Sequence, residues 1–232
     1  MQLVLLAGGY GTRLRTVTNG AKCLVHVRGR PILWHVIWQF APLQLDEVIV
    51  VAGFDGDAVC AYVAVTDWPG RVIVEVERQP HGTAPAVRSV LHRLDERFLL
   101  ANADTLIEGD VAAMARYADE QAATLCVGGV RVNGLVADYG VLEVEGTAPG
   151  RLRRFVEKPR GRRGPAWVNA GVYVVTRSSA LAMRADSVSF ERDVVQQECS
   201  SGSAYVFPLT RMLDLGTPDR LQEGVDAWVK DR

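Results

Sequence analysis

The 232-residue sequence predicts an α/β fold in which a mixed central sheet is covered by helices on both faces. Residues 2–7 form a continuous apolar run, which suits a strand buried on both faces better than an alternating surface strand. Strand-like and helix-like segments then alternate up to residue 122, which indicates right-handed crossovers and a mostly parallel sheet. Successive strand-like segments follow from residue 123, which indicates a mixed or antiparallel extension.

The first half of the chain, residues 1–122, is expected to supply the parallel part of the sheet. Its first strand ends abruptly at Gly8-Gly9. A helix is expected to start at Pro31, because proline suits a first helical turn and the apolar residues after it recur at helical spacing. Further strands are expected at 47–52, 71–77 and 97–102, and further helices near 57–64, 84–94 and 111–121.

The second half, residues 123–232, is expected to complete a single domain that spans the whole chain. The basic, glycine-containing and proline-terminated stretch 160–165 reads as a loop. A helical piece is expected near 190–198, and a closing helix over 218–229. The expected strands are 124–132, 139–145, 151–157, 166–175 and 204–209.

Composition excludes several classes of protein. Hydrophobic residues make up 48% of the chain and charged residues 23%, which is the balance of a folded protein rather than a disordered one. The net charge of −1 argues against nonspecific nucleic-acid binding, which needs a basic face. No apolar run is long enough to cross a bilayer and no leader is recognised, so we expect a cytoplasmic protein. Widely spaced Cys23, Cys60, Cys126 and Cys199 are expected to be buried thiols.

The segment LAGGYGTRL, residues 6–14, carries the strongest chemical signal. Glycines directly after a buried strand let backbone N–H groups approach an anion, and Arg13 adds a forked cationic donor for phosphate oxygens. The arrangement is neither a P-loop nor a GxGxxG fingerprint, and the alternative is a glycine-rich turn that only joins strand to helix. We expect a phosphate-binding loop built from Leu6, Ala7, Gly8, Gly9, Gly11, Thr12 and Arg13.

This segment resembles the LAGGxGTRL signature of the sugar nucleotidyltransferase family, and the resemblance continues from residue 3 to about residue 220. It implies a Rossmann-like three-layer α/β/α nucleotidyltransferase sandwich that moves a nucleoside monophosphate from an NTP to a sugar 1-phosphate. SFERDVV at 189–195 and DLGTPDRL at 214–221 are most similar to the D-glycero-α-D-manno-heptose 1-phosphate guanylyltransferases of the family. Mannose 1-phosphate and cyclitol phosphates are alternative acceptors.

Two further segments are similar to the family's nucleotide-binding elements. Lys22 is expected beside the α-phosphate, although Ala21 stands where the family has proline. In ERQPHGTAPA, residues 77–86, Glu77 and Gly82 are expected to flank the base, with Thr83 beside them and Pro85 in place of a usual glycine. A carboxylate complements the N1–H and N2–H donors of guanine better than it complements uracil or thymine, which favours GTP; UTP, dTTP, ATP and CTP are the alternative nucleotides. The plainer alternatives are a surface lysine and an exposed strand-end carboxylate.

Two aspartates are expected to hold Mg²⁺, with Mn²⁺ as the alternative ion. Asn102 and Asp104 follow a predicted strand, at the edge where ligands of parallel sheets bind, and Ala103 replaces the family's glycine. The resemblance makes Asp214 the second metal ligand and Asn102 a nucleotide-binding residue. Two carboxylates suffice for a hard cation when phosphates complete its shell. The alternative for Asp104 is a helix cap.

The acceptor side is implied by three short segments that resemble the family's YG, VEKP and NaG elements. Glu157 is expected to accept hydrogen bonds from ring hydroxyls, and Lys158 to neutralise the sugar phosphate. The expected substrate-binding residues are Tyr139, Gly140, Glu157, Lys158, Asn169 and Gly171. A phosphate monoester needs no general base, so catalysis becomes alignment and charge neutralisation. The expected catalytic residues are Arg13, Lys22, Asp104, Lys158 and Asp214.

Two rival functions are weighed against this one. A GT-A-like glycosyltransferase also binds a nucleotide and a metal on an α/β sheet, but LAGGYGTRL with Lys22 argues against it. A nonenzymatic nucleotide sensor would not need both Asp104 and Asp214. The expected partners are therefore an NTP and a sugar 1-phosphate, without nucleic acid or membrane. The helix containing Trp34 and Trp38 is either part of the core or the interface of a homo-oligomer.

Overall fold

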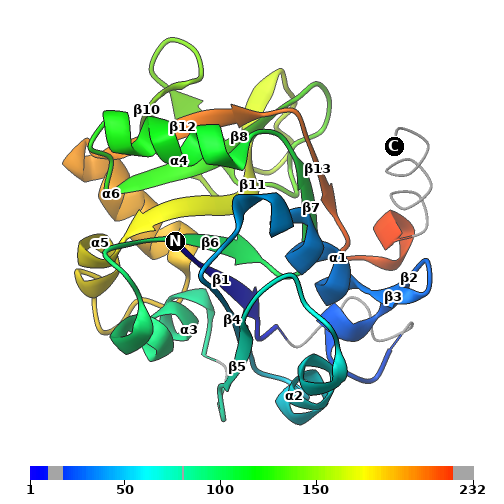
Figure 1. Ribbon diagram of the computed structural model, residues 1–232. Coiled ribbons are helices and arrows are strands. Elements are labelled where there is room, and N and C mark those ends of the chain that lie inside the picture. Colours follow the sequence, from blue (N-terminus) through cyan, green and yellow to red (C-terminus); the bar gives the residue numbers. More distant parts are fainter. Residues whose placement is uncertain (10–17, 80, 222–232) are drawn as a thin grey trace.

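The parallel part of the sheet is formed by the first half of the chain. The computed structural model describes residues 1–9, 18–79 and 81–221. In it β1 (Gln2–Ala7) lies between β4 (Glu47–Ala52) and β6 (Arg97–Asn102), and β5 (Val72–Val76) forms the edge beyond β4 (Figure 1). All of these neighbours are parallel, so their carboxyl ends meet at one edge of the sheet.

The second half extends the same sheet to nine strands in the described part of the chain and makes it mixed. β11 (Ala166–Thr176) pairs antiparallel with β6 and with β8 (Leu125–Val132). β12 (Ala204–Leu209) runs parallel to β8, and β10 (Gly150–Val156) and β9 (Val141–Val144) complete that side. The expected mixed central sheet is confirmed.

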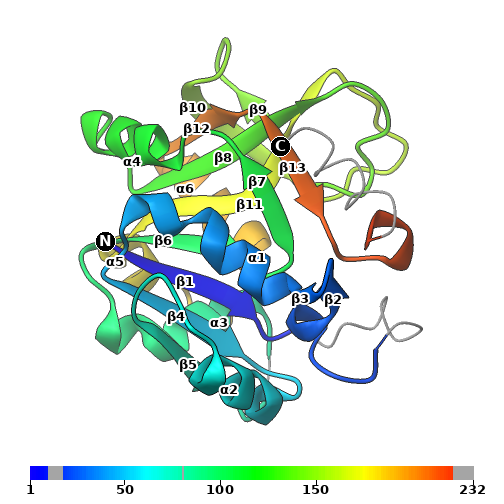
Figure 2. The same ribbon diagram turned by 45° about the vertical axis from the view of Figure 1, so that its right-hand side comes forward.

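Helices cover both faces of the sheet, as the sequence predicts. Leu3 and Leu5 of β1 belong to one buried cluster and Val4 to the other, so this strand is buried on both faces. The first cluster includes apolar residues of α1 (Ile32–Gln39), α2 (Gly56–Val65) and α4 (Val111–Glu120). The second includes those of α3 (Thr83–Val90), α5 (Arg177–Leu181), the π-helical η5 (Phe190–Val195) and α6 (Gln196–Ser201), which lie behind the sheet in Figure 2.

Several boundaries differ from the sequence-based expectation. Pro31 caps α1 instead of occupying its first turn, and the helix expected at 84–94 leaves α-helical geometry after Val90. The helix expected at 218–229 begins as predicted, with Thr217 Oγ1 accepting from Arg220 N at 3.4 Å, but residues 222–232 lie outside the described part. Several short elements have no counterpart among the expected ones. They are η2 (Lys22–Leu24), η3 (Ala41–Leu43), η4 (Leu91–Arg93), and the pairs of β2 (His26–Val27) with β3 (Arg30–Pro31) and of β7 (Thr105–Glu108) with β13 (Arg211–Asp214).

Three of the four cysteines are buried thiols, as the sequence predicts. All four cysteines are free; Cys60 is half-buried and the other three are buried. Burial raises the pKa of the Cys23 thiol to about 12.

On α1, Ile32, Leu33, Val36 and Ile37 are buried, whereas Trp38 is 39% exposed. The inner side of this helix is therefore core, and its tryptophans lie toward the outside.

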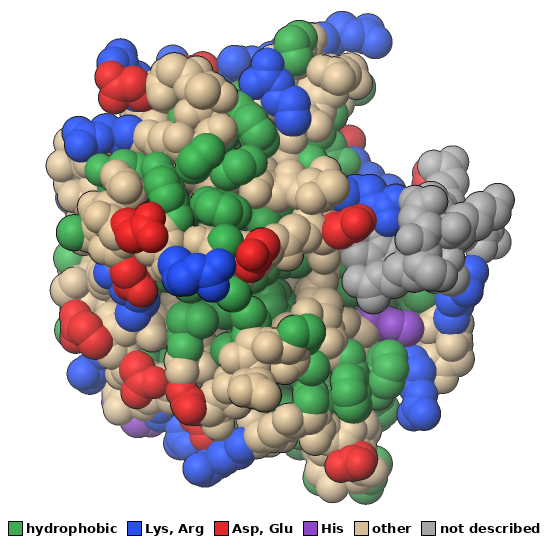
Figure 3. Space-filling model, turned by 45° about the horizontal axis from the view of Figure 1, so that its top comes forward, with side chains coloured by type: hydrophobic (Ala, Val, Ile, Leu, Met, Phe, Trp, Pro, Cys, Tyr) green, Lys and Arg blue, Asp and Glu red, His purple; other side chains and the backbone are tan. Residues whose placement is uncertain are grey.

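The surface carries both signs of charge. Acidic and basic side chains are interspersed on the face shown in Figure 3, as the net charge of −1 leads one to expect. Among the described residues, no helix is both long enough and apolar enough to cross a bilayer.

Candidate active site

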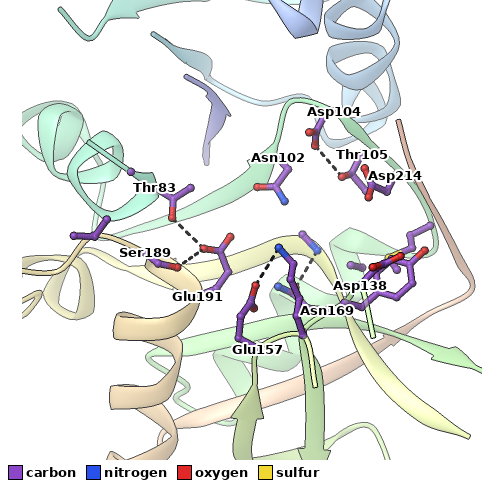
Figure 4. A pocket seen from close by; sticks show the side chains of 18 residues that line it. Thr83, Asn102, Asp104, Thr105, Asp138, Glu157, Asn169, Ser189, Glu191 and Asp214 are labelled. Atoms are coloured by element: carbon purple, nitrogen blue, oxygen red, sulfur yellow. Dashed lines mark hydrogen bonds and ion pairs between the residues drawn. The ribbon is translucent and has the colours of Figure 1, made fainter. Parts of the chain in front are cut away.

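A pocket of about 400 Å³ opens where the carboxyl end of β6 meets β11 and the β7–β13 pair. Figure 4 shows polar side chains from distant parts of the sequence directed into it. The predicted site residues that line it are Gly82, Thr83, Asn102, Asp104, Tyr139, Gly140, Glu157, Lys158, Asn169, Gly171 and Asp214. Its polar lining and size suit a small hydrophilic ligand.

The floor of the pocket is an interruption in β11. The register of β11 with β8 shifts between Asn169 and Tyr173, and Gly171 lies there at φ +70°. A Cβ on Gly171 would approach Asn102 Nδ2 to 2.6 Å, so glycine is required. Asn169 Oδ1 accepts from Gly171 N at 2.9 Å, and Asn169 Nδ2 donates to the Tyr173 hydroxyl at 2.6 Å. Asn169 therefore holds the bulge that opens the strand toward the pocket.

Asp104 and Asp214 lie together although 110 residues separate them in the sequence. Asp214 is opposite Thr105 in the β7–β13 pair, and Leu215 N donates to Asp104 O at 2.9 Å. Both carboxylates belong to the lining of the pocket. The adjacent strand ends thus bring together the two aspartates that the sequence analysis expected at one metal ion.

Each of these carboxylates is paired with a cation of the chain. Lys22 Nζ donates to Asp104 Oδ2, and Arg220 Nη1 donates to Asp214 Oδ2. Arg220 Nη2 also donates to Asp138 Oδ2 at 2.9 Å. A pair of carboxylates that attracts two cations has the charge and the oxygen atoms that a hard divalent ion prefers. Within residues 1–9, 18–79 and 81–221 no cluster of three or more metal-ligating side chains occurs, so such an ion would need further oxygens from a bound phosphate.

Lys22 reaches Asp104 from a loop that is anchored by Asp55. Ala21 N donates to Asp55 Oδ2 at 3.2 Å, and Ala21 has φ −57°, a value that proline also adopts. The alanine therefore keeps the backbone shape expected of proline and adds a hydrogen bond that proline is unable to make. Lys22 is not among the residues that line the pocket; its amino group lies beside Asp104 and 3.0 Å from the position of a Cβ built on Gly216.

Glu77, which is predicted to bind the base, follows β5 and lies against Gly8 at the end of β1. A Cβ built on Gly8 would lie 3.0 Å from Glu77 Oε2, so these two residues face each other. Burial raises the pKa of the Glu77 carboxyl above its usual range. Leu6 O accepts from Ala103 N at 3.1 Å, which ties the end of β1 to the segment that carries Asp104. Ala7 and Gly9 adjoin this region, and Gly11, Thr12 and Arg13 lie outside the described residues.

Four of the predicted acceptor residues line the pocket next to its floor: Tyr139, Gly140, Glu157 and Lys158. Glu157 and Lys158 follow β10, with Lys158 Nζ 3.3 Å from Glu157 Oε1. Asn169 N donates to Gly140 O at 2.8 Å, which joins the 138–140 loop to the floor. The Arg220 guanidinium lies 5.2 Å from the centre of the Tyr139 ring, and burial raises the pKa of the Tyr139 hydroxyl. Glu157, Lys158 and this loop thus enclose one end of the pocket.

Sequence reasoning missed several residues of the pocket. SFERDVV at 189–195 is similar to a family segment, but its pattern assigns no role to its polar residues. Asp138 directly precedes the predicted Tyr139, which was the available signal for it. Arg220 was also missed, since nothing local indicates that it reaches Asp214 and Asp138. The pocket-lining residues without a predicted role are Thr105, Asp138, Ala170, Val188, Ser189, Glu191 and Met212.

Comparison with known proteins adds a family and a set of related folds. The family model described as nucleotidyl transferase matches residues 2–230. A mannose-1-phosphate guanyltransferase of Aspergillus fumigatus is 27% identical over 236 residues, which cover 99% of this chain and 64% of that protein. Mannose-1-phosphate guanylyltransferase 1 of Arabidopsis thaliana is 25% identical, with 99% and 65% covered. The chain therefore spans about two thirds of the length of these relatives.

Solved structures share the fold over almost their full length. HddC from Yersinia pseudotuberculosis, in a complex with GMP-PN, superposes with a TM-score of 0.83 and 24% identity, covering 98% of this chain and 99% of that one. A UDP-glucose pyrophosphorylase from Acinetobacter baumanii gives a TM-score of 0.86 and 18% identity, with 100% and 94% covered. The Rossmann-like α/β sandwich expected from the sequence is thus confirmed.

Proposed function

The chain belongs to the nucleotidyl transferase family, and we propose that it transfers a nucleoside monophosphate from an NTP to a sugar 1-phosphate and releases pyrophosphate. The observation that carries this proposal is the convergence on one pocket of two groups of residues. Asp104 and Asp214 form the first group, and Glu157 with Lys158 forms the second. One group suits a metal-bound triphosphate and the other a phosphorylated, hydroxyl-rich ring.

GTP is the proposed nucleotide. The Glu77 carboxylate at the end of β5 offers acceptor-only oxygens to the N1–H and N2–H donors of guanine. Two comparisons support this choice, since the relatives in Aspergillus fumigatus and Arabidopsis thaliana are described as acting on mannose 1-phosphate with guanylyl transfer. HddC, which shares the fold, was crystallised with GMP-PN. The proposed acceptor is heptose 1-phosphate or a similar sugar 1-phosphate.

The proposed reaction is a direct displacement at the α-phosphorus of the NTP. An oxygen of the acceptor phosphate forms the new P–O bond, the bond to the β-phosphate oxygen breaks, and pyrophosphate leaves with its electron pair. Asp104 and Asp214 would hold Mg²⁺, or Mn²⁺, which neutralises charge on the phosphates when bound. Lys22 lies beside Asp104, where it would meet the α-phosphate, and Lys158 would neutralise the acceptor phosphate. Arg13 is proposed to grip the triphosphate.

A matrix of nucleotides and acceptors tests the proposal. GTP, UTP, dTTP, ATP and CTP are each incubated with heptose, mannose and glucose 1-phosphates, and pyrophosphate release is measured with Mg²⁺ present. We expect release with GTP and at least one acceptor, and none when the acceptor is omitted. A preference for UTP or dTTP would overturn the role of Glu77. No pyrophosphate with any pair, from protein that binds GTP in calorimetry, would favour a nucleotide sensor.

A further inference from the structure

Glu191 is a carboxylate in the pocket to which the proposed reaction gives no role. It lies in the π-helical turn η5, is half-buried, and contributes to the pocket lining. Thr83 Oγ1 donates to Glu191 Oε2 at 3.0 Å, and Ser189 Oγ donates to the same oxygen at 3.1 Å. Figure 4 shows this carboxylate directed into the pocket from the side of Thr83 and Ser189. Two hydroxyls therefore hold one of its oxygens.

The segment that carries Glu191 is fastened to the start of α3. Phe190 N donates to Thr83 Oγ1 at 2.7 Å, and Ala84 N donates to Val188 O at 3.1 Å. The backbones approach so closely that a Cβ on Gly82, which has φ +122°, would lie 2.2 Å from Val188 O. The Thr83 hydroxyl is thus used as both donor and acceptor inside the protein, and its single O–H is directed at Glu191.

The negative charge of Glu191 has no ion-pair partner in the described part of the chain, and a second carboxylate, that of Glu157, lines the same pocket. Among the residues that the structure describes, no cation forms an ion pair with Glu191, whereas Lys158 accompanies Glu157 on the same pocket. Tyr173, whose hydroxyl accepts from Asn169 Nδ2 at 2.6 Å, is fully buried. Burial raises the pKa of its hydroxyl well above the usual range, and the charges of Glu191 and Glu157 raise it further. Both carboxylates line the same pocket.

We propose that Glu191, held by Thr83 and Ser189, determines the specificity of the acceptor pocket for neutral, hydroxylated rings. An ionised carboxylate only accepts hydrogen bonds, so it favours hydroxyl donors of the ring. No residue in the described part of the chain pairs a cation with it, so its charge repels a second anionic substituent, such as the carboxylate of a sugar acid. Thr83 is then a positioning residue for the acceptor, although the sequence analysis placed it with the nucleotide. The inference rests on the proposed function and narrows its substrate class.

Glu191→Gln tests the inference, because the amide keeps the shape of the side chain and removes its charge. The KM and kcat for GTP, for a neutral hexose or heptose 1-phosphate, and for a uronic acid 1-phosphate are measured. We expect the KM for the neutral acceptor to rise about 10- to 100-fold, the effect of weakening a hydrogen bond to a charged group, while the KM for GTP stays within about twofold. The preference for neutral over acidic acceptor should fall about tenfold or more.

Glu143→Gln is the matched control, since Glu143 on β9 pairs with Arg162 at 3.0 Å and does not line the pocket. It should change none of these constants. A wild-type protein that releases no pyrophosphate with any acceptor overturns the proposed function and the inference together. An active wild type whose Glu191→Gln variant keeps its acceptor KM and its preference overturns the inference alone.

Thr83 provides a second test that leaves the carboxylate itself unchanged, and it decides the question if Glu191→Gln fails to fold. Thr83→Val removes the hydroxyl that donates to Glu191, and Thr83→Ser keeps it. We expect the valine variant to raise the acceptor KM about tenfold with an unchanged KM for GTP, and the serine variant to behave as wild type. Should the valine variant raise the KM for GTP instead, Thr83 serves the nucleotide and its role as the support of Glu191 is overturned.

Discussion

Replacing Asp104 by Asn removes one negative charge from the pair of carboxylates and keeps the volume of the side chain. Asp104 accepts from Lys22 through Oδ2 and from the Thr105 hydroxyl through Oδ1 at 3.2 Å. The asparagine oxygen still accepts one of these hydrogen bonds, but it binds a hard divalent cation far more weakly than a carboxylate does. The variant therefore changes the charge of the site and leaves its shape nearly unchanged.

The expected change in stability follows from how exposed the pair is. The Lys22 side chain is 15% exposed and that of Asp104 is 29% exposed. Breaking a fully buried pair costs about 3–5 kcal/mol and breaking an exposed pair about 0–1 kcal/mol. Solvent screening places this pair between those limits, at about 1–2 kcal/mol. For a chain of this size that lowers Tm by about 2–8 °C.

The expected change in activity is much larger. Losing one of two protein ligands to the metal is expected to lower kcat for pyrophosphate release by about 1,000-fold or more, equivalent to about 4 kcal/mol of transition-state stabilisation. Pyrophosphate release and thermal unfolding are measured on the same preparation. Asp119→Asn is the control, because Asp119 pairs with Arg97 on an exposed surface and should keep wild-type activity. Product formation near the wild-type rate by a folded Asp104→Asn protein would refute the reasoning.

Three further substitutions test other parts of the account. Glu77→Gln should raise the KM for GTP about tenfold or more in the pyrophosphate assay. Burial raises the folded-state pKa of Glu77 above its usual 4.5, so the glutamine variant should be the more stable protein at neutral pH. This difference in stability should vanish below pH 4.5, where the carboxyl is protonated in both the folded and the unfolded state. A difference that grows on acidification would contradict this prediction. Gly171→Ala should raise the acceptor KM and lower Tm, because Asn102 must move; kinetics like those of wild type would show that the bulge tolerates a Cβ. Glu198→Ala should lower the free energy of unfolding in urea by about 2–4 kcal/mol. The reason is that the buried Glu198 carboxylate accepts from Ser179 Oγ at 2.7 Å and from the Thr124 hydroxyl. The control Glu145→Ala, at an exposed residue, should leave the free energy of unfolding unchanged.

The parallel half of the fold was predictable because its signals are local. Residues 2–7 are apolar without interruption, and their side chains enter both buried clusters as that pattern indicates. The strand at 97–102 ends two residues before Asp104, so the sequence alone indicates a carboxylate at the carboxyl edge of the sheet. A strand that ends in a short polar motif therefore indicates, from the local sequence alone, which residues form one side of a site.

The β7–β13 pair was not predictable, because its partners are four-residue strands about a hundred residues apart. Neither strand has enough alternating residues to be recognised alone, and the pairing depends on how the rest of the chain folds. Yet this pair sets Asp214 beside Thr105 and so beside Asp104. The resemblance to a family named both aspartates, but only the fold shows what brings them together.

Glu191 and Arg220 escaped sequence reasoning for a different reason. Both lie in helical turns where a charged residue is usually solvated, and the sequence does not show which side of the turn faces a cavity. Glu191 acquires its place from Gly82, whose lack of a Cβ lets Val188 approach the start of α3. Such tertiary contacts between unrelated segments have no signal in the local pattern.

The fate of the α-phosphate tests the central claim most directly. The protein is incubated with Mg²⁺, a sugar 1-phosphate and GTP labelled at the α-phosphorus, and the products are separated. Nucleotidyl transfer predicts that the label passes into a nucleotide sugar in an amount equal to the pyrophosphate released. Label that stays in GTP, or that appears as free GDP or GMP without a labelled nucleotide sugar, would contradict the account.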